Sequence, residues 1–208
     1  MHIQFDRLLI VPLILALLAG CSNKSTRLYV LTADVAKPAA TSTQGIPIGV
    51  GPVTLPKYLD RPQVVSRAAG NSLNQADLDQ WGGDLADNIT RVLATNLANL
   101  LTTDRVSLYP WPDRVPVDYQ ITLDVAKFEQ EPDGGIVLDA FWRLVSLSSS
   151  KVLVMRRSIH RVSGAPVETT GSGAADARSY DAVAAAMSRD LETLSHDIAN
   201  EIRIQKGS

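Results

Sequence analysis

Apolar side chains recur at steps of four and three residues in two parts of the chain, which is the period of an amphipathic α-helix. The first stripe comprises Trp81, Leu85, Ile89, Leu93, Leu97 and Leu100, and the second comprises Val183, Met187, Leu191, Leu194, Ile198 and Ile202. Gly82 and Gly83 weaken the start of the first stripe, because glycine is a poor helix former. We therefore expect a helix that is most regular over residues 84–101, and a second one near the C-terminus.

Short polar side chains ahead of each stripe are candidates for the helix caps. Asp77 or Asp79 could accept the free N–H groups of the first helix, and Ser179 could do so for the second.

Alternation of apolar and polar residues, typical of half-buried strands, predicts a sheet from the rest of the chain. The expected strands cover residues 27–32, 46–51, 63–67, 72–74, 105–109, 119–125, 136–144 and 152–160. A break in the alternation at Phe128 predicts a bulge near Ala126 and Lys127. The stretch from Glu131 to Gly135 is a strong hairpin turn. This order predicts an α+β fold: a two-layer domain, with a mixed, largely antiparallel sheet and two long helices on one face.

The N-terminus carries an apolar run of eleven residues, Leu8 to Leu18. The run is too short to span a bilayer as a helix, which needs about 20 apolar residues, but it fits a signal peptide over residues 1–20. Leu18-Ala19-Gly20-Cys21 resembles the lipobox of bacterial lipoproteins, which predicts lipidation of Cys21. The alternative, a buried free cysteine, is disfavoured because this sole cysteine lies where a signal peptide is cut. Ser22, where aspartate would retain a lipoprotein at the inner membrane, points to the outer membrane.

Composition then sets the domain organisation. Residues 33–45 are rich in Ala, Pro, Ser and Thr without periodicity, so we expect residues 21–45 to form a lipidated N-terminus and flexible connector. Residues 46–208 would form a single α+β domain. The chain is 45% hydrophobic with a net charge of −2, and this balance gives no support for nucleic-acid binding. The lone cysteine excludes intrachain disulfides.

The sequence offers little support for catalysis, and we predict no catalytic, cofactor-binding or metal-binding residues. The chain has three histidines and no zinc-type spacing, nucleophile elbow or phosphate-binding loop. Sequence order cannot exclude a Ser-His-Asp triad, because triads are defined by geometry. A nucleophile hydrogen-bonded to His160 or His196 in a pocket would favour a periplasmic hydrolase.

The segment Leu55-Pro-Lys-Tyr-Leu-Asp-Arg-Pro62 is the main candidate for a binding site. A proline-stiffened loop with aromatic and arginine side chains loses little entropy on binding. Leu55, Tyr58, Leu59 and Arg61 are therefore the candidate partner-contact residues. Packing of these side chains under the sheet edge is the alternative, and both readings remain open. For Tyr109-Pro-Trp-Pro112 we favour a role in capping the core.

Several stretches together resemble the ABC-type transport auxiliary lipoprotein family. They are the lipobox, Tyr29-Val-Leu31, Val50 to Val65, Gln80-Trp81, Arg91-Val-Leu93, Tyr109-Pro-Trp111 and Asp197 to Ile202. The resemblance implies a non-enzymatic accessory of a lipid-transport system that bridges two membranes. Its partners would be an MCE-domain protein that forms a periplasmic tunnel and an inner-membrane component. The lipoprotein would dock or stabilise the tunnel at the outer membrane, and a homo-oligomeric ring is among the assemblies that the resemblance implies. An assembly or chaperone lipoprotein for another envelope machine is the alternative.

Overall fold

The computed structural model describes residues 25–33, 42–163 and 177–207. Its elements, in chain order, are β1 (Arg27–Tyr29), β2 (Ile48–Thr54), β3 (Gln63–Arg67), β4 (Leu73–Trp81), α2 (Leu85–Leu101), β5 (Val106–Leu108), β6 (Tyr119–Gln130), β7 (Ile136–Ser146), β8 (Lys151–Val162) and α3 (Ala177–Gly207). The predicted signal peptide, Cys21, Ser22 and most of the predicted connector lie outside the described residues.

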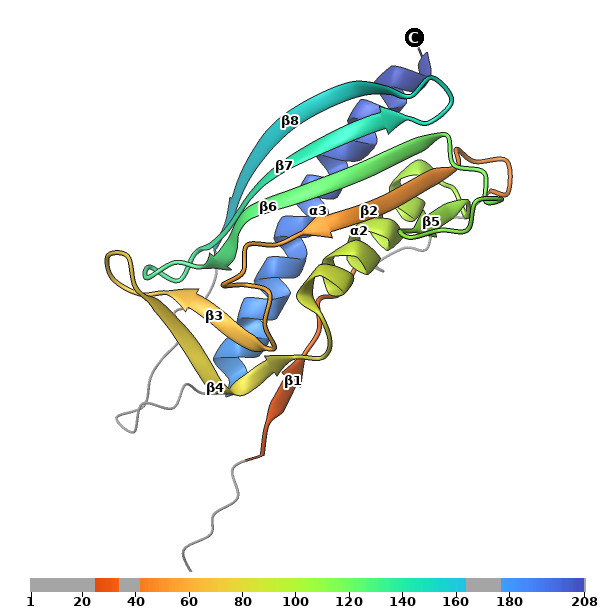
Figure 1. The fold of residues 1–208 in the computed structure, drawn as a ribbon. Coiled ribbons are helices and arrows are strands. Elements are labelled where there is room, and N and C mark those ends of the chain that lie inside the picture. The colour runs from red at the N-terminus through yellow and green to blue at the C-terminus, as the bar shows by residue number, and fades with distance from the viewer. Residues whose placement is uncertain (1–24, 34–41, 164–176, 208) are drawn as a thin grey trace, which may run out of the picture.

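One eight-stranded mixed sheet contains all of the strands (Figure 1). The long strands β6, β7 and β8 form an antiparallel meander, and β2 lies parallel to both β6 and β5. The smaller group of β3, β4 and β1 joins the sheet at the end of β6, where Ser66 pairs with Gln130. Both helices pack on the same side of the sheet, behind it in the view of Figure 1. The predicted α+β class is thus confirmed.

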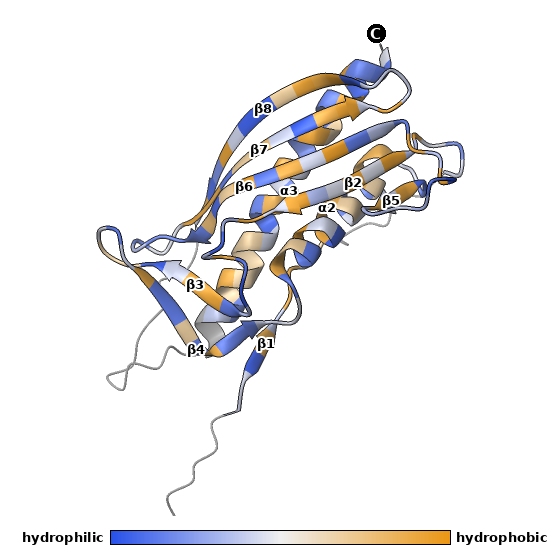
Figure 2. Cartoon of the chain, in the orientation of Figure 1, coloured by the Kyte–Doolittle hydropathy of each residue, from blue (hydrophilic) through white to orange (hydrophobic). Residues whose placement is uncertain are grey.

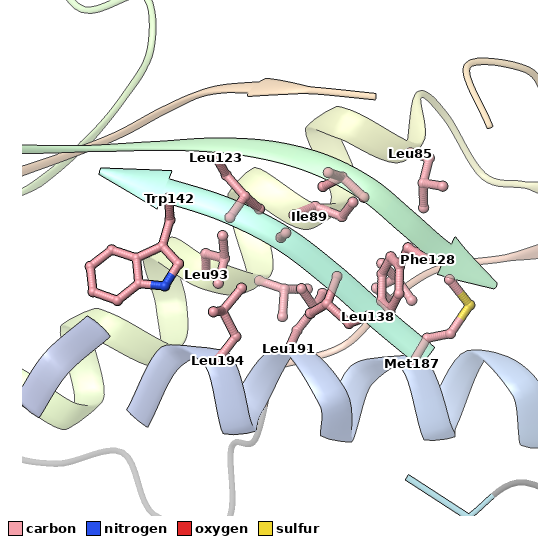
Figure 3. Close-up of a cluster of buried hydrophobic side chains, with 14 of the residues drawn as sticks. Leu85, Ile89, Leu93, Leu123, Phe128, Leu138, Trp142, Met187, Leu191 and Leu194 are labelled. Carbon is pink, nitrogen blue, oxygen red and sulfur yellow. The ribbon is translucent and has the colours of Figure 1, made fainter. Parts of the chain in front are cut away.

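The two predicted helical stripes form the core. In α2, Leu85, Ile89, Leu93 and Leu97 are buried, and every predicted stripe residue of α3, from Val183 to Ile202, is at most 2% exposed. Figure 3 shows these side chains meeting those of β6 and β7, among them Leu138 and Trp142. Burial of each such large apolar side chain stabilises the folded state by roughly 1.5–3 kcal/mol relative to leaving it exposed. The hydrophobic period of the sequence therefore identifies the faces that hold the two layers together.

The predicted start of the first helix is wrong. Residues 73–81 form β4, a nine-residue strand, and Trp81 is buried at its end rather than on the helix. The helix begins only at Leu85, after Asp84 in the N-cap position. Gly83 has a φ of +129°, which no helical residue adopts and which separates the strand from the helix. Ser179 is likewise not a cap, because α3 begins at Ala177.

The predicted turn and bulge in the meander are confirmed. Glu131 N–H donates to Gly135 O at 2.8 Å, and Gly134 has a φ of +86°, which favours glycine at this turn position. The pairing of β6 with β7 shifts register between Val125 and Lys127. The shift inserts one extra residue in β6 and changes which of its side chains face the helices beyond that point.

The segment before the predicted domain start is also part of the sheet. β1 pairs with β4, and Arg27 donates to both carboxylate oxygens of Asp79 at 2.6 and 2.7 Å. The Tyr29 hydroxyl donates to the same carboxylate at 2.8 Å, and Leu31 is buried in the core. Asp79, predicted as a helix cap, instead fixes β1 to β4. The strand predicted over residues 27–32 is thus present as β1, within the range that we assigned to the lipidated N-terminus and connector.

One acidic residue on α3 lies in the core. Asp190 is fully buried, and neither of its carboxylate oxygens has a hydrogen-bond partner of good geometry. Burial raises the pKa of Asp190 to about 7, although the nearby backbone of Leu138 offsets part of this effect. The folded protein consequently holds this proton at pH values where the unfolded chain has released it.

This difference predicts that the free energy of unfolding falls as the pH rises from about 4 to about 7. The pKa of this carboxyl is about 7 in the folded protein and 3.8 in the unfolded chain. This difference accounts for a loss of roughly 4 kcal/mol in the free energy of unfolding over that range. Asp190→Asn removes the ionisable group, so its stability gain over the wild type should be larger at pH 8 than at pH 5. Urea unfolding of both proteins at several pH values measures the difference. An equal gain at both pH values would contradict the assignment.

Candidate functional site

The proline-rich loop, defined here as residues 55–62, connects β2 to β3 and is held by its own backbone. Pro56 O accepts hydrogen bonds from Leu59 N–H at 2.9 Å and from Asp60 N–H at 3.2 Å. Pro62 O accepts one from Trp81 N–H at 2.7 Å, which fixes the end of the loop to β4. The loop therefore has a defined shape, as its proline content predicted.

The four predicted contact residues of the loop do not share one environment. Leu59 is 3% exposed and belongs to the core, and Leu55 and Tyr58 pack against the core with partly buried side chains. Only Arg61 is exposed, and its Nη1 donates to Gln75 Oε1 of β4 at 2.5 Å. Packing thus accounts for three of these side chains, whereas the Arg61 side chain is exposed to solvent.

A buried charge pair that the sequence analysis missed lies next to the loop. Glu129 on β6 is fully buried, and Arg67 on β3 donates from Nε to its Oε1 at 2.7 Å. Burial and the neighbouring Glu129 carboxylate raise the pKa of Tyr58, so this phenol stays protonated. Next along β6, Lys127 pairs with Glu131. The pairs join the loop, β3 and the end of β6 at the point where the sheet branches.

In the sequence, the only indication of this cluster is the set of charged residues Lys127, Glu129 and Glu131 at the end of a largely apolar strand. Glu129 follows the bulge of β6, where the strict alternation of buried and exposed positions is lost. Its partner Arg67 lies 62 residues earlier in the chain. Nothing local in the sequence marks such a pairing.

A second polar cluster lies between β8 and α3, beside an open surface pocket of about 360 Å³. Trp142 Nε1 donates to Ser158 Oγ at 3.1 Å, and Ser158 Oγ donates to Asp197 Oδ2 at 3.4 Å. His160 Nε2 lies 3.0 Å from the same Asp197 oxygen, and Arg156 pairs with Glu201 at 2.9 Å. Strand and helix are therefore joined by polar side chains along this side.

The geometry of this cluster differs from that of a catalytic triad. In a triad the histidine lies between the nucleophile and the acid, whereas here Asp197 lies between Ser158 and His160. His196 has a carboxylate neighbour, Glu192, at 4.0 Å. Among the described residues, no hydroxyl donates to either histidine, so the hydrolase hypothesis gains no support.

Two further observations concern metals and membranes. Within the described ranges, no three His, Cys, Asp or Glu side chains gather as a metal site. No helix in the part of the chain that the structure covers is both long enough and apolar enough to cross a bilayer.

Comparison with solved structures identifies the fold class. A crystal structure of an uncharacterized protein matches with a TM-score of 0.64 and 19% identity, covering 86% of this chain and 99% of its own. The crystal structure of protein XCC0632 from Xanthomonas campestris matches with a TM-score of 0.64 and 15% identity, covering 87% of this chain and 97% of its own. At these identities the similarity shows a shared fold.

The family follows from the sequence itself. The model of the ABC-type transport auxiliary lipoprotein component matches residues 29–199, and the chain belongs to this family. Membership makes the protein an auxiliary lipoprotein component of an ABC-type transport system, and it implies a lipid anchor in a membrane. No curated protein sequence matches the chain significantly.

The buried pair beside the loop yields a stability prediction. Arg67→Met removes the cationic partner of the buried Glu129, which should lower the free energy of unfolding by about 3–5 kcal/mol. Adding Glu129→Gln removes the buried charge and should recover most of this loss. Chemical unfolding of the single and double variants measures both effects. A single variant as stable as the wild type would show that the pair does not hold the loop region together.

Proposed function

We propose that this protein is an outer-membrane-anchored lipoprotein that serves as the accessory component of an MCE-type intermembrane lipid transport system. The observation that carries the proposal is the family match over residues 29–199. The role is to dock or stabilise the periplasmic tunnel formed by an MCE-domain protein, whose inner end meets the inner-membrane component of the transporter. The proposal includes assembly as a homo-oligomeric ring, which light scattering of the purified protein tests.

Two features of the N-terminal sequence support the outer membrane as the location. Cys21 ends a lipobox-like sequence and is the only cysteine of the chain, and Ser22 lacks the retention signal of inner-membrane lipoproteins. Several acyl chains on one cysteine give stable membrane attachment, whereas a single chain gives only marginal binding.

The exposed side of the proline-rich loop supports a docking role. The buried Leu59 and the partly buried Tyr58 pack the loop against the core, and the Arg61 side chain beside them is exposed. A preformed loop binds without the entropy cost of ordering a flexible one. Arginine in such a position is a frequent hot-spot residue at protein interfaces. We therefore expect the MCE-domain protein to contact the loop at Arg61.

A photo-crosslinking residue in place of Arg61 tests this contact in living cells. The expected product is an adduct with the MCE-domain protein of the same transporter. The matched control carries the crosslinker in place of Lys206, which is exposed at the C-terminal end of α3, far from β3 in Figure 1. An adduct with an outer-membrane barrel protein instead would contradict the transport proposal and favour an assembly role.

A charge reversal at Arg61 measures how much this residue contributes to partner binding. Arg61→Glu should weaken co-purification of the MCE-domain protein at least tenfold, because it reverses the exposed charge of the loop. The melting temperature should change little, since the Arg61 side chain is exposed and its hydrogen bond is to Gln75 at the surface. Full partner binding by folded Arg61→Glu would exclude the loop as the docking site.

Changes at the N-terminus test the anchor separately. Cys21→Ala should leave a folded protein that fractionates away from membranes, since no acyl chain can be attached. Ser22→Asp should keep the lipid but move the protein to the inner-membrane fraction. Density-gradient fractionation with marker proteins of both membranes distinguishes these results. Outer-membrane fractionation of both variants would contradict the proposed location.

A further inference from the structure

β8 forms one edge of the sheet along its whole length of twelve residues. One side of its backbone pairs with β7, and among the described residues no strand pairs with the other side. The strand contains no proline, which would block further pairing. A long edge of this kind can accept an additional strand.

Side chains of β8 alternate between two environments. Val154 is buried, Arg156 pairs with Glu201, and His160 and Ser158 contact Asp197, so these residues face α3. The intervening residues face away from α3, on the open side of the sheet. They are Met155, Arg157, Ile159 and Arg161.

The open side therefore presents apolar and cationic side chains in turn. Met155 is 67% and Ile159 60% exposed, which is unusual for large apolar residues within a strand. The Arg157 and Arg161 side chains are 51% and 49% exposed. On the adjacent strand β7, Phe141 is 46% exposed. The Arg157 guanidinium lies over the Phe141 ring, with Cζ 5.3 Å from the ring centroid. Figure 2 shows polar and apolar bands along the two strands.

Charge distinguishes the candidate partners of this edge. β8 carries Lys151, Arg156, Arg157 and Arg161 but no acidic residue. If two copies of β8 paired with each other, no register would put a carboxylate opposite an arginine, and several registers would put arginines together. Like charges directly opposite each other destabilise a strand pair. The composition of β8 thus opposes pairing with itself and favours an acidic strand.

We propose that the free edge of β8 binds an extended segment of a partner protein in which apolar and acidic residues alternate, and that this segment joins the sheet as an additional strand. Main-chain hydrogen bonds to the free edge supply affinity. Apolar residues of the segment lie beside Met155 and Ile159, and its carboxylates lie beside Arg157 and Arg161. The ion pairs of these arginines with Asp139 and Asp133 orient them, and both guanidinium groups remain half-exposed for a second carboxylate.

This inference goes beyond the proposed transport role and does not depend on it. It concerns the surface of β8, which is separated from β1 by the other strands of the sheet, and it does not involve the proline-rich loop. Its test uses neither the lipid anchor nor the transporter, so the two proposals can fail independently.

The test measures binding of a synthetic peptide to the purified protein by fluorescence anisotropy. The probe is Thr-Val-Thr-Glu-Thr-Val-Thr-Glu-Thr, blocked at both ends, which places Val and Glu alternately on one face of a strand. The matched control peptide has Lys in place of Glu. We expect at least tenfold tighter binding of the Glu peptide, and slower hydrogen exchange of β8 amides in the complex. Equal binding of both peptides would overturn the proposal.

A peptide N-methylated on alternate residues separates strand addition from simple charge attraction. Methylation on the bonding edge removes the N–H donors while the charges remain, so binding should be lost. Retained binding, or exchange protection elsewhere than in β8, would contradict strand addition.

Protein variants complete the test. Arg157→Glu with Arg161→Glu should reverse the preference toward the Lys peptide, whereas Arg91→Glu on the exposed side of α2 should not. Because the first pair of changes also removes two ion pairs, Met155→Ser with Ile159→Ser serves as a second variant at exposed positions and should weaken Glu-peptide binding at least fivefold. Unchanged binding by this variant would overturn the proposal. Self-association of the wild type that Met155→Ser with Ile159→Ser abolishes would instead make a second copy the occupant of the edge.

Discussion

The packing of α3 against the sheet is the interaction on which the rest of the structure depends. The helix contacts β1, β6, β7 and β8 as well as α2, so it joins the meander to the smaller β3–β4–β1 group. Its buried stripe, from Val183 to Ile202, is continuous over more than five turns. Where α3 meets the center of the sheet the contact is apolar, and toward the edge strand β8 it becomes polar. Polar contacts of Arg156, Ser158 and His160 with α3 therefore add to the burial of Val154 in holding β8.

The sequence predicted those parts of the fold that depend on local periodicity. The apolar stripes of α2 and α3, the turn at Gly134 and the bulge after Val125 all follow from patterns within a few residues. It failed at β4, because Trp81 happens to stand one helical step before Leu85, and because the buried Asp79 breaks the apolar alternation of the strand. The burial of Asp79 depends on Arg27, 52 positions away, and no local pattern reveals such a partner.

The same limit applies to the candidate site. The prolines of the loop predict a stiffened segment, yet they do not indicate which side chains point inward. That division depends on where β6 and the buried Glu129 lie beneath the loop, and on the pairing of Glu129 with Arg67 across the sheet branch. The sequence alone also does not indicate that β8 has a free edge. Its sequence resembles that of an ordinary half-buried strand, and only the strand order shows that no strand of the described residues pairs with its outer side.

The position of β1 has a consequence for how an anchored molecule would move. Arg27 is only the sixth residue after Cys21, and six extended residues span at most about 20 Å. Because the ion pair with Asp79 fixes β1 in the sheet, a chain lipidated at Cys21 could neither swing far from the bilayer nor turn over freely. Diffusion would then be confined to a thin layer parallel to the membrane, with one end of the sheet always nearest to the lipid. An encounter with a partner in that layer becomes a two-dimensional search between molecules that are already oriented.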